Sequence, residues 1–415
     1  MKRLKVLVSA YACRPSEGSE PGVGWNVVRE LVKYHDIWVL TREDNRASIE
    51  TELAHNPLLG LQFIYCEPPA LIQKLNHNQR LVYLHYYLWQ IKAYSVAKTL
   101  HSQLEFDIAH HVTYVRYSTP SFLALLPIPF VWGPVGGAES APAVFWTDFS
   151  IRGKIYETLR DLARRIGELD PFVHMTAQKS ILARGTTEDT TERLRKLGAQ
   201  TVQTTSQLGL SDEEIAQLVR YGKTQPQGVR FISMGRLLHW KGFHLGLKAF
   251  AQAELPEDTE YWIIGDGPER SPLENLAKEL GIHSQVKFWN KLSRSETLQK
   301  LADCSVLVHP SLHESGGLVC LEAMAAGRPV ICLNLGGPAL QVTPENGFKV
   351  STQSRELATQ EMAMAMKTLA RDPELRTSMG KAGQQRVKEC YSWVVRGKDL
   401  AQLYELIVQN KINKR

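Results

Sequence analysis

The stretch that decides the fold reads VLVHPSLHESGGLVCLEAMAAGRPVI and spans residues 306–331. Its apolar start predicts a buried strand over residues 305–309. The apolar pattern of residues 318–326 predicts a helix, which Gly327 ends. A second apolar run at residues 329–333 predicts the next strand. Strand, helix and strand in this order indicate a parallel sheet that is covered by helices.

The same alternation of short apolar runs and amphipathic segments continues in both directions along the chain. Because 415 residues are too many for one hydrophobic core, we expect two doubly wound α/β domains. The strands predicted in the first half are residues 4–10, 37–41, 61–66, 107–109 and 129–132, and those in the second half are residues 229–234, 261–265, 286–289, 305–309 and 329–333.

A change of composition marks the predicted domain boundary. Residues 221–228 (YGKTQPQG) have the composition of a linker. Just before them, Ser211 and Glu214 form the signature of a capping box for a short helix. Residues 392–410 are periodic in apolar side chains and predict a closing helix. The predicted parts are a first domain over residues 1–207, a second over residues 208–390 and a terminal helix over residues 391–415.

Composition and charge narrow the class of ligand. Hydrophobic residues make up 43% of the chain and charged residues 22%, as in an ordinary globular protein. The net charge of +6 is suited to anionic ligands such as nucleotide phosphates, or to an anionic membrane surface, and is too small to indicate nucleic acid. The six cysteines lack zinc-ligand spacing and fit a reducing cytoplasm. No apolar run reaches the roughly 18 residues of a membrane span.

Two segments have an alternative interpretation as membrane-facing surfaces. Residues 81–100 combine five aromatic residues with basic ones, which suits either an interfacial helix or an ordinary helix with its aromatic side in the core. Residues 151–168 are rich in arginine and suit either a membrane-facing surface or a solvated charged face. The residues concerned are Arg80, Tyr83, Tyr86, Tyr87, Trp89, Lys92, Tyr94 and Lys98 in the first segment, and Arg152, Lys154, Arg160, Arg164 and Arg165 in the second.

The densest chemical signal is HESGGLVCLE at residues 313–322. Gly316 and Gly317 allow the backbone to approach a ligand closely, and the helix that follows presents unpaired N–H groups that hold phosphate. Glu314 precedes this helix, and Glu322 lies about two turns inside it. A bound nucleotide sugar would span the distance between these two carboxylates, with its sugar at Glu314 and its ribose at Glu322. The alternative is a capping carboxylate and a solvated helix residue.

Two cations follow the strand predicted over residues 229–234. Arg236 comes directly after Gly235, and Lys241 opens the next helix. A guanidinium and an ammonium at the carboxyl end of a strand can clamp a diphosphate, with charged hydrogen bonds of about 1.5–3 kcal/mol each. The alternative is a pair of surface cations that cap a turn. The nearby turn GDGP at residues 265–268 lacks the third glycine of a dinucleotide-binding fingerprint.

The first half supplies two glycine-rich loops and a pair of histidines. The loop at residues 17–25 (EGSEPGVGW) follows the first strand without the Gly-Lys-Ser/Thr of an NTPase, and residues 130–139 end another strand in a Gly-Gly loop. His110 and His111 stand at a predicted strand end. No third metal ligand is near them, so we expect no metal site. One histidine is expected to contact sugar hydroxyls and the other to lie in the core.

Together these motifs resemble the family 4 retaining glycosyltransferases of the GT-B fold, in a bacterial subgroup that often serves surface polysaccharide assembly. Four motifs occur in the family's order between residues 230 and 347: FISMGRLLHWKG, WIIGDGPE, VLVHPSLHESGGLVCLEAMAAGRPVI and NLGGPA. The loops EPGVGW and WGPVGG resemble that subgroup. The resemblance implies an α/β GT-B fold, with two doubly wound Rossmann-like domains facing across a cleft and a last helix that crosses back onto the first domain.

The resemblance also implies a role for each site residue. Arg236 and Lys241 would hold the diphosphate, Glu314 the transferred sugar and Glu322 the ribose. The implied catalytic residues are Glu314, Arg236, Lys241 and His111, and the implied donor-binding residues are Gly22, Gly24, Gly235, Gly316, Gly317, Leu318, Val319, Glu322 and Asn290. The sequence departs from the family at Val112, where a histidine is common, and at Asn290, where a glycine is usual.

The activity implied by the resemblance is transfer of a hexose from a UDP- or GDP-sugar to a saccharide or lipid-linked acceptor, in polysaccharide or glycoconjugate synthesis. Such enzymes retain the anomeric configuration and need no metal or other cofactor. The expected location is the cytoplasm, with peripheral contact at the inner membrane surface. The alternatives are a non-catalytic nucleotide-sugar-binding or regulatory protein on the same fold, or a nucleotide-sugar epimerase.

Overall fold

The computed structural model describes residues 3–69, 82–114, 116–222 and 228–412. The chain divides into two units. Unit 1 contains Met1–Ala138, Asp161–Gln207 and Trp393–Arg415, and unit 2 contains Glu139–Arg160 and Leu208–Ser392. The predicted first domain, residues 1–207, therefore includes a segment, Glu139–Arg160, that the structure groups with unit 2. Helix α5 (Ile151–Glu168) begins in this segment and ends in unit 1.

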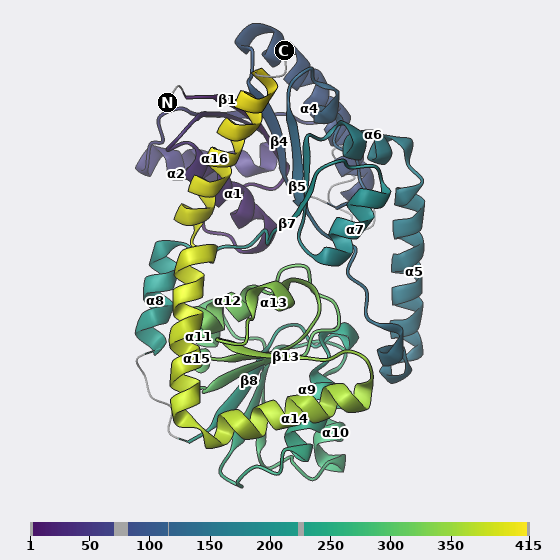
Figure 1. Ribbon diagram of the computed structural model, residues 1–415, viewed down its shortest axis with the longest axis vertical. Coiled ribbons are helices and arrows are strands. Elements are labelled where there is room, and N and C mark those ends of the chain that lie inside the picture. Colours follow the sequence, from purple (N-terminus) through teal and green to yellow (C-terminus); the bar gives the residue numbers. More distant parts are fainter. Residues whose placement is uncertain (1–2, 70–81, 115, 223–227, 413–415) are drawn as a thin grey trace. The chain divides into compact units, whose positions relative to one another are not determined.

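Unit 1 is built on a parallel sheet whose seven described strands run in the order β3-β2-β1-β4-β5-β6-β7 (Figure 1). The strands are β1 (Lys5–Ala10), β2 (Asp36–Thr41), β3 (Leu61–Tyr65), β4 (Ile108–Thr113), β5 (Phe130–Val135), β6 (Leu182–Gly185) and β7 (Val202–Thr204). Its helices are α1 (Ser19–Leu31), α2 (Arg46–His55), α4 (Val82–Leu104), α6 (Pro171–Lys179), α7 (Glu188–Lys196) and α16 (Trp393–Ile412).

Separate hydrophobic clusters cover the two faces of this sheet, which is why the central part of β1, Val6–Val8, is a continuous apolar run. Helix α16 contributes Leu400, Tyr404 and Ile407 to one of the clusters, so the terminal helix belongs to unit 1. Strands β6 and β7 were not predicted because they are short and carry few large apolar side chains.

Unit 2 is built on a second parallel sheet, with six described strands in the order β10-β9-β8-β11-β12-β13. The strands are β8 (Arg230–Met234), β9 (Glu260–Ile264), β10 (Val286–Trp289), β11 (Val306–His309), β12 (Val330–Leu333) and β13 (Gly347–Val350). The helices are α8 (Asp212–Gly222), α9 (Phe243–Gln252), α10 (Arg270–Glu279), α11 (Arg294–Ala302), α12 (Leu318–Ala325), α13 (Gly336–Gln341), α14 (Arg355–Arg371) and α15 (Pro373–Arg386). Five of these strands are predicted by the sequence to within a residue or two.

The predicted capping box at the start of α8 is confirmed. The N–H of Glu214 donates to Oγ of Ser211 at 3.1 Å, and the N–H of Ser211 donates to Oε2 of Glu214 at 2.9 Å. The linker predicted over residues 221–228 falls largely on residues 223–227, which lie outside the described residues.

The aromatic segment predicted over residues 81–100 makes up most of α4, and its core interpretation is confirmed. Tyr86 and Trp89 are fully buried, and Nε1 of Trp89 donates to the carbonyl of Cys66 at 2.8 Å. Arg80 lies outside the described residues, as does the side chain of Tyr83. Among the helices that the structure describes, none combines the length and the apolar character needed to cross a membrane.

Candidate functional site

The candidate site of unit 2 lies where the strand order reverses between β8 and β11, at the carboxyl ends of both strands. Open parallel sheets bind their ligands at this point. Gly235 and Arg236 follow β8 directly. The side chain of Arg236 is exposed, and its guanidinium makes no hydrogen bond or ion pair with the described part of the chain. A cation without an internal partner is available to an anionic ligand.

Lys241 and Glu314 are brought together by a close approach of two loops. The turn η5 (His239–Lys241) is followed by Gly242 with a φ of +66°, and a Cβ at this glycine would lie 2.0 Å from the carbonyl oxygen of Pro310. The N–H of Leu312 also donates to the carbonyl of Trp240 at 2.8 Å. As a result Nζ of Lys241 donates to Oε2 of Glu314. Lys241, which is predicted to bind the diphosphate, thus forms an ion pair with Glu314, which is predicted to bind the transferred sugar.

The charges in this pair are set by burial and by each other. Burial raises the pKa of Glu314 and the Lys241 ammonium lowers it, with a net shift below the usual value. His309, at the end of β11, has Nε2 3.8 Å from Oε2 of Glu314. Burial, and then the Lys241 charge, lower the pKa of His309 to about 4. At neutral pH Glu314 is therefore a carboxylate and His309 a neutral imidazole.

Helix α12 begins beside this pair. Its N-cap is Gly317, with a φ of +76° that favours glycine. The N–H groups of Leu318 and Val319 open the helix and have no carbonyl four residues back within it, so they suit an anion. Gly316 is buried, and its carbonyl accepts from Nε2 of Gln341 at 2.7 Å. Because Gly317 occupies the N-cap, the alternative that Glu314 caps this helix is wrong.

Glu322 lies in α12 with 4% of its surface exposed, so the alternative of a solvated helix residue is also wrong. Nη1 of Arg294, at the start of α11, lies 2.6 Å from Oε1 of Glu322. Burial raises the pKa of Glu322 to about 6, and the Arg294 charge opposes this shift. Arg294 was missed in the sequence because a half-exposed arginine at a helix start carries no motif.

Glu157 of α5 was also missed, and it is the most highly connected carboxylate near the site. It is 1% exposed and accepts from Nε2 of His239 at 3.0 Å, from Nε2 of His313 at 3.1 Å and from Nη1 of Arg160 at 3.1 Å. Burial raises its pKa, but the bonds from His239 and His313 outweigh burial and hold the pKa far below the usual range. His239 and His313 stand two residues before Lys241 and directly before Glu314. Glu157 therefore ties together the two loops that carry the ion pair.

Aromatic stacking strengthens the same junction. The ring of Trp240 lies between Tyr156 and His313, with centroid distances of 5.0 and 5.1 Å and interplanar angles of 10° and 17°. In addition, Oγ of Ser315 donates to Oε2 of Glu139 at 2.5 Å. The segment Glu139–Arg160 thus supports residues on both sides of Glu314. Sequence separation hides these contacts, since Glu157 and His313 are 156 positions apart.

Asn290 lies apart from this cluster. It is exposed and directly follows β10, which is the edge strand of the sheet. Its Oδ1 lies 3.5 Å from Nη1 of Arg270. The donor-base contact assigned to Asn290 stays a prediction.

The candidate residues of unit 1 have different surroundings from those expected. Strand β4 continues to Thr113, four residues beyond its predicted end, so His110 and His111 lie inside the sheet and are fully buried. The ring of His111 bonds to Oη of Tyr86 at 2.8 Å and to Oγ of Ser9 at 3.0 Å. Burial lowers the pKa of His111 to about 3. Both ring nitrogens are engaged, and the sugar contact assigned to His111 stays a prediction.

The loop predicted at residues 17–25 is largely helical, because α1 begins at Ser19. Gly22 and Gly24 therefore lie in the first two turns of a helix. A Cβ at Gly24 would lie 2.3 Å from the carbonyl oxygen of Ala12, and one at Gly22 would lie 2.0 Å from that of Glu17. The structure thus supplies a packing reason for both glycines. Their donor contact stays a prediction.

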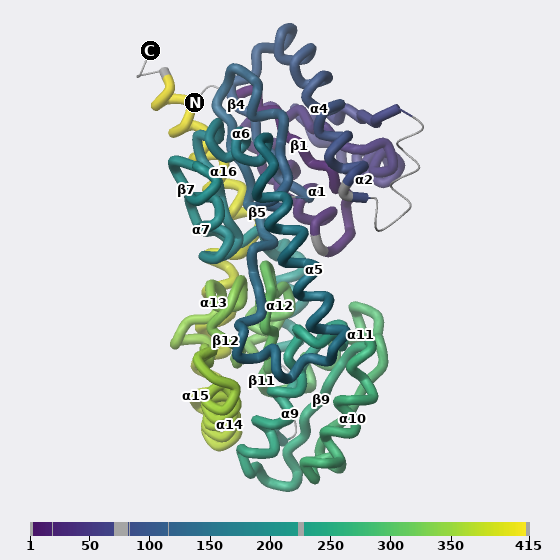
Figure 2. The backbone as a smooth tube through the Cα atoms, turned by 90° about the vertical axis from the view of Figure 1, so that its right-hand side faces the viewer, coloured from purple at the N-terminus to yellow at the C-terminus, as the bar shows by residue number. Residues whose placement is uncertain are grey.

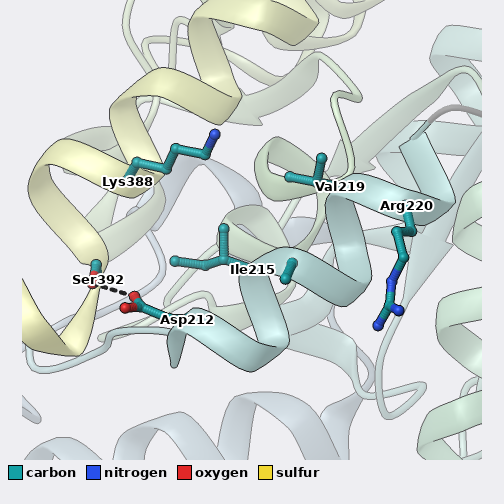
Figure 3. Close-up of a pocket in the computed structure, with 7 residues that line it drawn as sticks. Asp212, Ile215, Val219, Arg220, Lys388 and Ser392 are labelled. Atoms are coloured by element: carbon teal, nitrogen blue, oxygen red, sulfur yellow. Dashed lines mark hydrogen bonds between the residues drawn. The ribbon is translucent and has the colours of Figure 1, made fainter.

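A pocket in unit 2 lies away from the candidate site. It has a volume of about 590 Å³ and is lined by α8 together with Lys388 and Ser392 (Figure 3). Figure 3 shows Asp212 and Ser392 pointing toward one another, joined by a hydrogen bond of 2.9 Å. The lining contains no predicted site residue. Among the described residues, no group of three His, Cys, Asp or Glu side chains is placed to hold a metal ion.

Comparison with known proteins finds similarity over the part of the chain that carries the site. Residues 222–386 match the family model of glycosyl transferases group 1. The lipopolysaccharide core biosynthesis glycosyltransferase LpsD of Rhizobium meliloti is 31% identical over 161 residues, which cover 39% of this chain and 45% of LpsD. LpsE of the same organism is 36% identical over 157 residues, covering 37% and 43%. The chain thus spans less than half the length of these curated relatives.

Among solved structures, Anabaena HepE in complex with UDP aligns with a TM-score of 0.60 and 17% sequence identity, over 97% of this chain and 99% of HepE. At this identity the likeness concerns the fold. With the two parallel sheets described above, it shows that the GT-B fold predicted from the sequence is correct.

Proposed function

Because residues 222–386 match the family model of glycosyl transferases group 1 in a chain with the GT-B fold, we propose that this protein transfers a hexose from a nucleotide diphosphate sugar to a saccharide or lipid-linked acceptor. The partial likeness to two lipopolysaccharide core glycosyltransferases supports a role in lipopolysaccharide or glycoconjugate synthesis. The crystal structure of HepE with UDP supports a UDP-sugar as the first donor to test.

One observation carries the proposal: an exposed guanidinium, a lysine–glutamate ion pair and a helix N-terminus lie on adjoining loops at one edge of a sheet. Arg236 and the N–H groups of Leu318 and Val319 would bind the diphosphate. Lys241 would move from Glu314 toward the phosphate when the donor binds. Glu314 would then face the transferred sugar, and Glu322 would accept hydrogen bonds from the ribose.

The proposed chemistry places most of the catalysis on the leaving diphosphate. Charge develops on its oxygens as the glycosidic bond breaks, and preorganised cations and N–H groups stabilise that charge. The acceptor attacks from the same face, its proton passes to the leaving phosphate, and the anomeric configuration is retained. The carboxylate of Glu314 would stabilise positive charge at the anomeric carbon. This scheme uses no metal and no separate general base.

A thermal-shift panel of UDP, GDP, ADP and their common sugar conjugates, with and without Mg²⁺, tests donor binding. A ligand at about 100 times its dissociation constant adds roughly 2.7 kcal/mol to the free energy of unfolding, which raises the melting temperature by several degrees. Arg236→Ala should abolish the shift without lowering the melting temperature of the free protein, because this side chain has no partner among the residues that the structure describes. Arg165→Ala, which removes an exposed cation of α5, is the matched control.

Product analysis with the donor so identified separates the alternatives. An enzyme that transfers the sugar forms a new glycoside, whose anomeric configuration is measured by NMR. Conversion of the donor sugar to its epimer without an acceptor would replace the proposal with an epimerase. Tight donor binding without turnover against a panel of saccharide and lipid-linked acceptors would favour a binding protein.

A further inference from the structure

Helix α5 is amphipathic, and its apolar side is exposed while its polar side packs against the protein. Six aliphatic residues follow one another at spacings of three and four, which places them on one side of a helix. Each exposes between 52% and 81% of its surface. They form the apolar stripe: Ile151, Ile155, Leu159, Leu162, Ile166 and Leu169, the last just after the end of α5.

The opposite side of α5 holds the helix to the protein through polar groups and glycine. Glu157 receives the histidine bonds described above, and Nη2 of Arg160 donates to the carbonyl of Glu139 at 2.7 Å. A Cβ at Gly153 would lie 3.1 Å from the ring of His239, and one at Gly167 would lie 2.6 Å from the carbonyl of Ser118. The helix is therefore anchored by its polar side, and Figure 2 shows α5 with no other element drawn in front of it.

The charges on α5 are distributed to suit an anionic surface. Arg152, Lys154 and Arg165 are exposed and have no ion pair with the described part of the chain. The acidic residues of the helix are occupied: Glu157 is buried, Oδ1 of Asp161 accepts from Arg164 at 2.9 Å, and Oε1 of Glu168 accepts from Tyr117 at 2.7 Å. The exposed face thus combines aliphatic side chains with exposed positive charge.

We propose that the apolar stripe of α5 and its flanking basic residues bind the surface of an anionic lipid bilayer, with the helix lying in the plane of the interface. Aliphatic side chains enter the boundary between headgroups and acyl chains, and basic side chains attract anionic headgroups. A protein partner fits less well, because stable protein interfaces use about 20–30 residues on each side and the stripe offers six. The inference does not rest on sugar transfer, since lipid binding is measured without donor or acceptor.

The test is flotation of the full chain with vesicles of phosphatidylcholine alone and of phosphatidylcholine with an equal amount of phosphatidylglycerol. The wild type should float with the anionic vesicles at low salt and remain unbound with the neutral ones. Ile155→Glu with Leu162→Glu should abolish flotation. The triple variant Arg152→Ala, Lys154→Ala and Arg165→Ala should weaken partitioning on the order of 100-fold, at roughly 1 kcal/mol per basic residue.

Met364→Glu is the control, because Met364 is an exposed apolar residue on α14, with 62% of its surface accessible. It should float like the wild type. Since all these positions are exposed, circular dichroism and melting temperature should match the wild type. The proposal is overturned if the wild type stays unbound to anionic vesicles, or if the double glutamate variant floats as well as the wild type. Concentration-dependent dimers that the same variant abolishes, without lipid binding, would assign the stripe to a protein interface instead.

Discussion

The sheet edge at β8 and β11 in unit 2 and the sheet edge at β1 and β4 in unit 1 share a topology and differ in their charges. Both lie where the strand order of a parallel sheet reverses. In unit 2 the edge carries the ion pair of Lys241 with Glu314 and the exposed Arg236, which has no ion pair with the described residues. In unit 1 it carries side chains that bond to one another, such as His111 with Tyr86 and Tyr11 with His85. The cation beside them, Arg42, lies over the ring of Tyr11 and is paired with Asp44.

The difference arises from where the polar residues stand relative to the strand ends. Glu314 follows β11 by five residues and lies on a loop, where a charge can meet a ligand. His111 lies within β4, where both faces of the sheet are covered and a charged imidazole would be costly. Topology therefore supplies two similar edges, and the position of the charge decides which edge can bind an anion.

The largest expected effect is on catalysis at the unit 2 edge. Glu314→Ala should lower kcat by about 10²–10³ while changing donor affinity little, because the carboxylate is proposed to act on the transition state. Steady-state kinetics of sugar transfer measures both parameters. Glu314→Gln, which keeps the shape and removes the charge, should show a similar loss. A variant whose KM alone changes would contradict the assigned role.

The next largest effect is expected at Glu157, which holds the loops that carry Lys241 and Glu314. Glu157→Ala leaves His239 and His313 without their shared acceptor, so we expect the free energy of unfolding to fall by about 3 kcal/mol, as for a broken buried ion pair. Denaturant unfolding measures this loss. A positioning role also predicts that kcat of the folded variant falls about tenfold with KM nearly constant, and that Glu157→Asp recovers part of kcat. Full activity in folded Glu157→Ala would show that Glu157 contributes to stability and not to catalysis.

A smaller effect is expected from the buried Glu322. Its pKa of about 6 lies above the ordinary value of 4.5, so between these pH values the folded state keeps a proton that the unfolded chain releases. The free energy of unfolding should therefore fall as pH rises through this window, by about 2 kcal/mol at most. Unfolding of the wild type and of Glu322→Gln across pH 4–7 checks this, and the variant should lack the slope. Glu322→Ala should also weaken nucleotide binding.

The smallest effect is expected at the unit 1 edge. His111→Gln should cost about 1 kcal/mol of stability, since an amide can keep one of the two hydrogen bonds. Nucleotide affinity, measured by calorimetry, should be unchanged because His111 belongs to the other unit. A fall in kcat of more than about tenfold, with the fold and nucleotide affinity intact, would assign the sugar contact to His111 after all. A loss of nucleotide affinity would show that the unit 1 edge also takes part in nucleotide binding, against the expectation.

The sequence by itself determined the two sheets, five strands of unit 2 to within a residue or two, the start of α12 at Leu318 and the capping box before α8. These features depend on apolar periodicity, glycine and local capping, which act over a few neighbouring residues. The sequence also placed Lys241 and Glu314 after strands of one sheet, but it assigned them separate ligands, and their pairing depends on the tertiary contact of the two loops.

Only the tertiary structure decided the burial of His111, the contact of Arg294 with Glu322 and the junction made by Glu157. Each depends on chain segments that are far apart in sequence and on how much water the packing excludes. The orientation of α5 is of the same kind: its sequence shows an amphipathic helix, but periodicity alone does not tell which side faces the protein. The side of α5 that carries Gly153 and Glu157 packs against the protein, so the aliphatic side is left exposed.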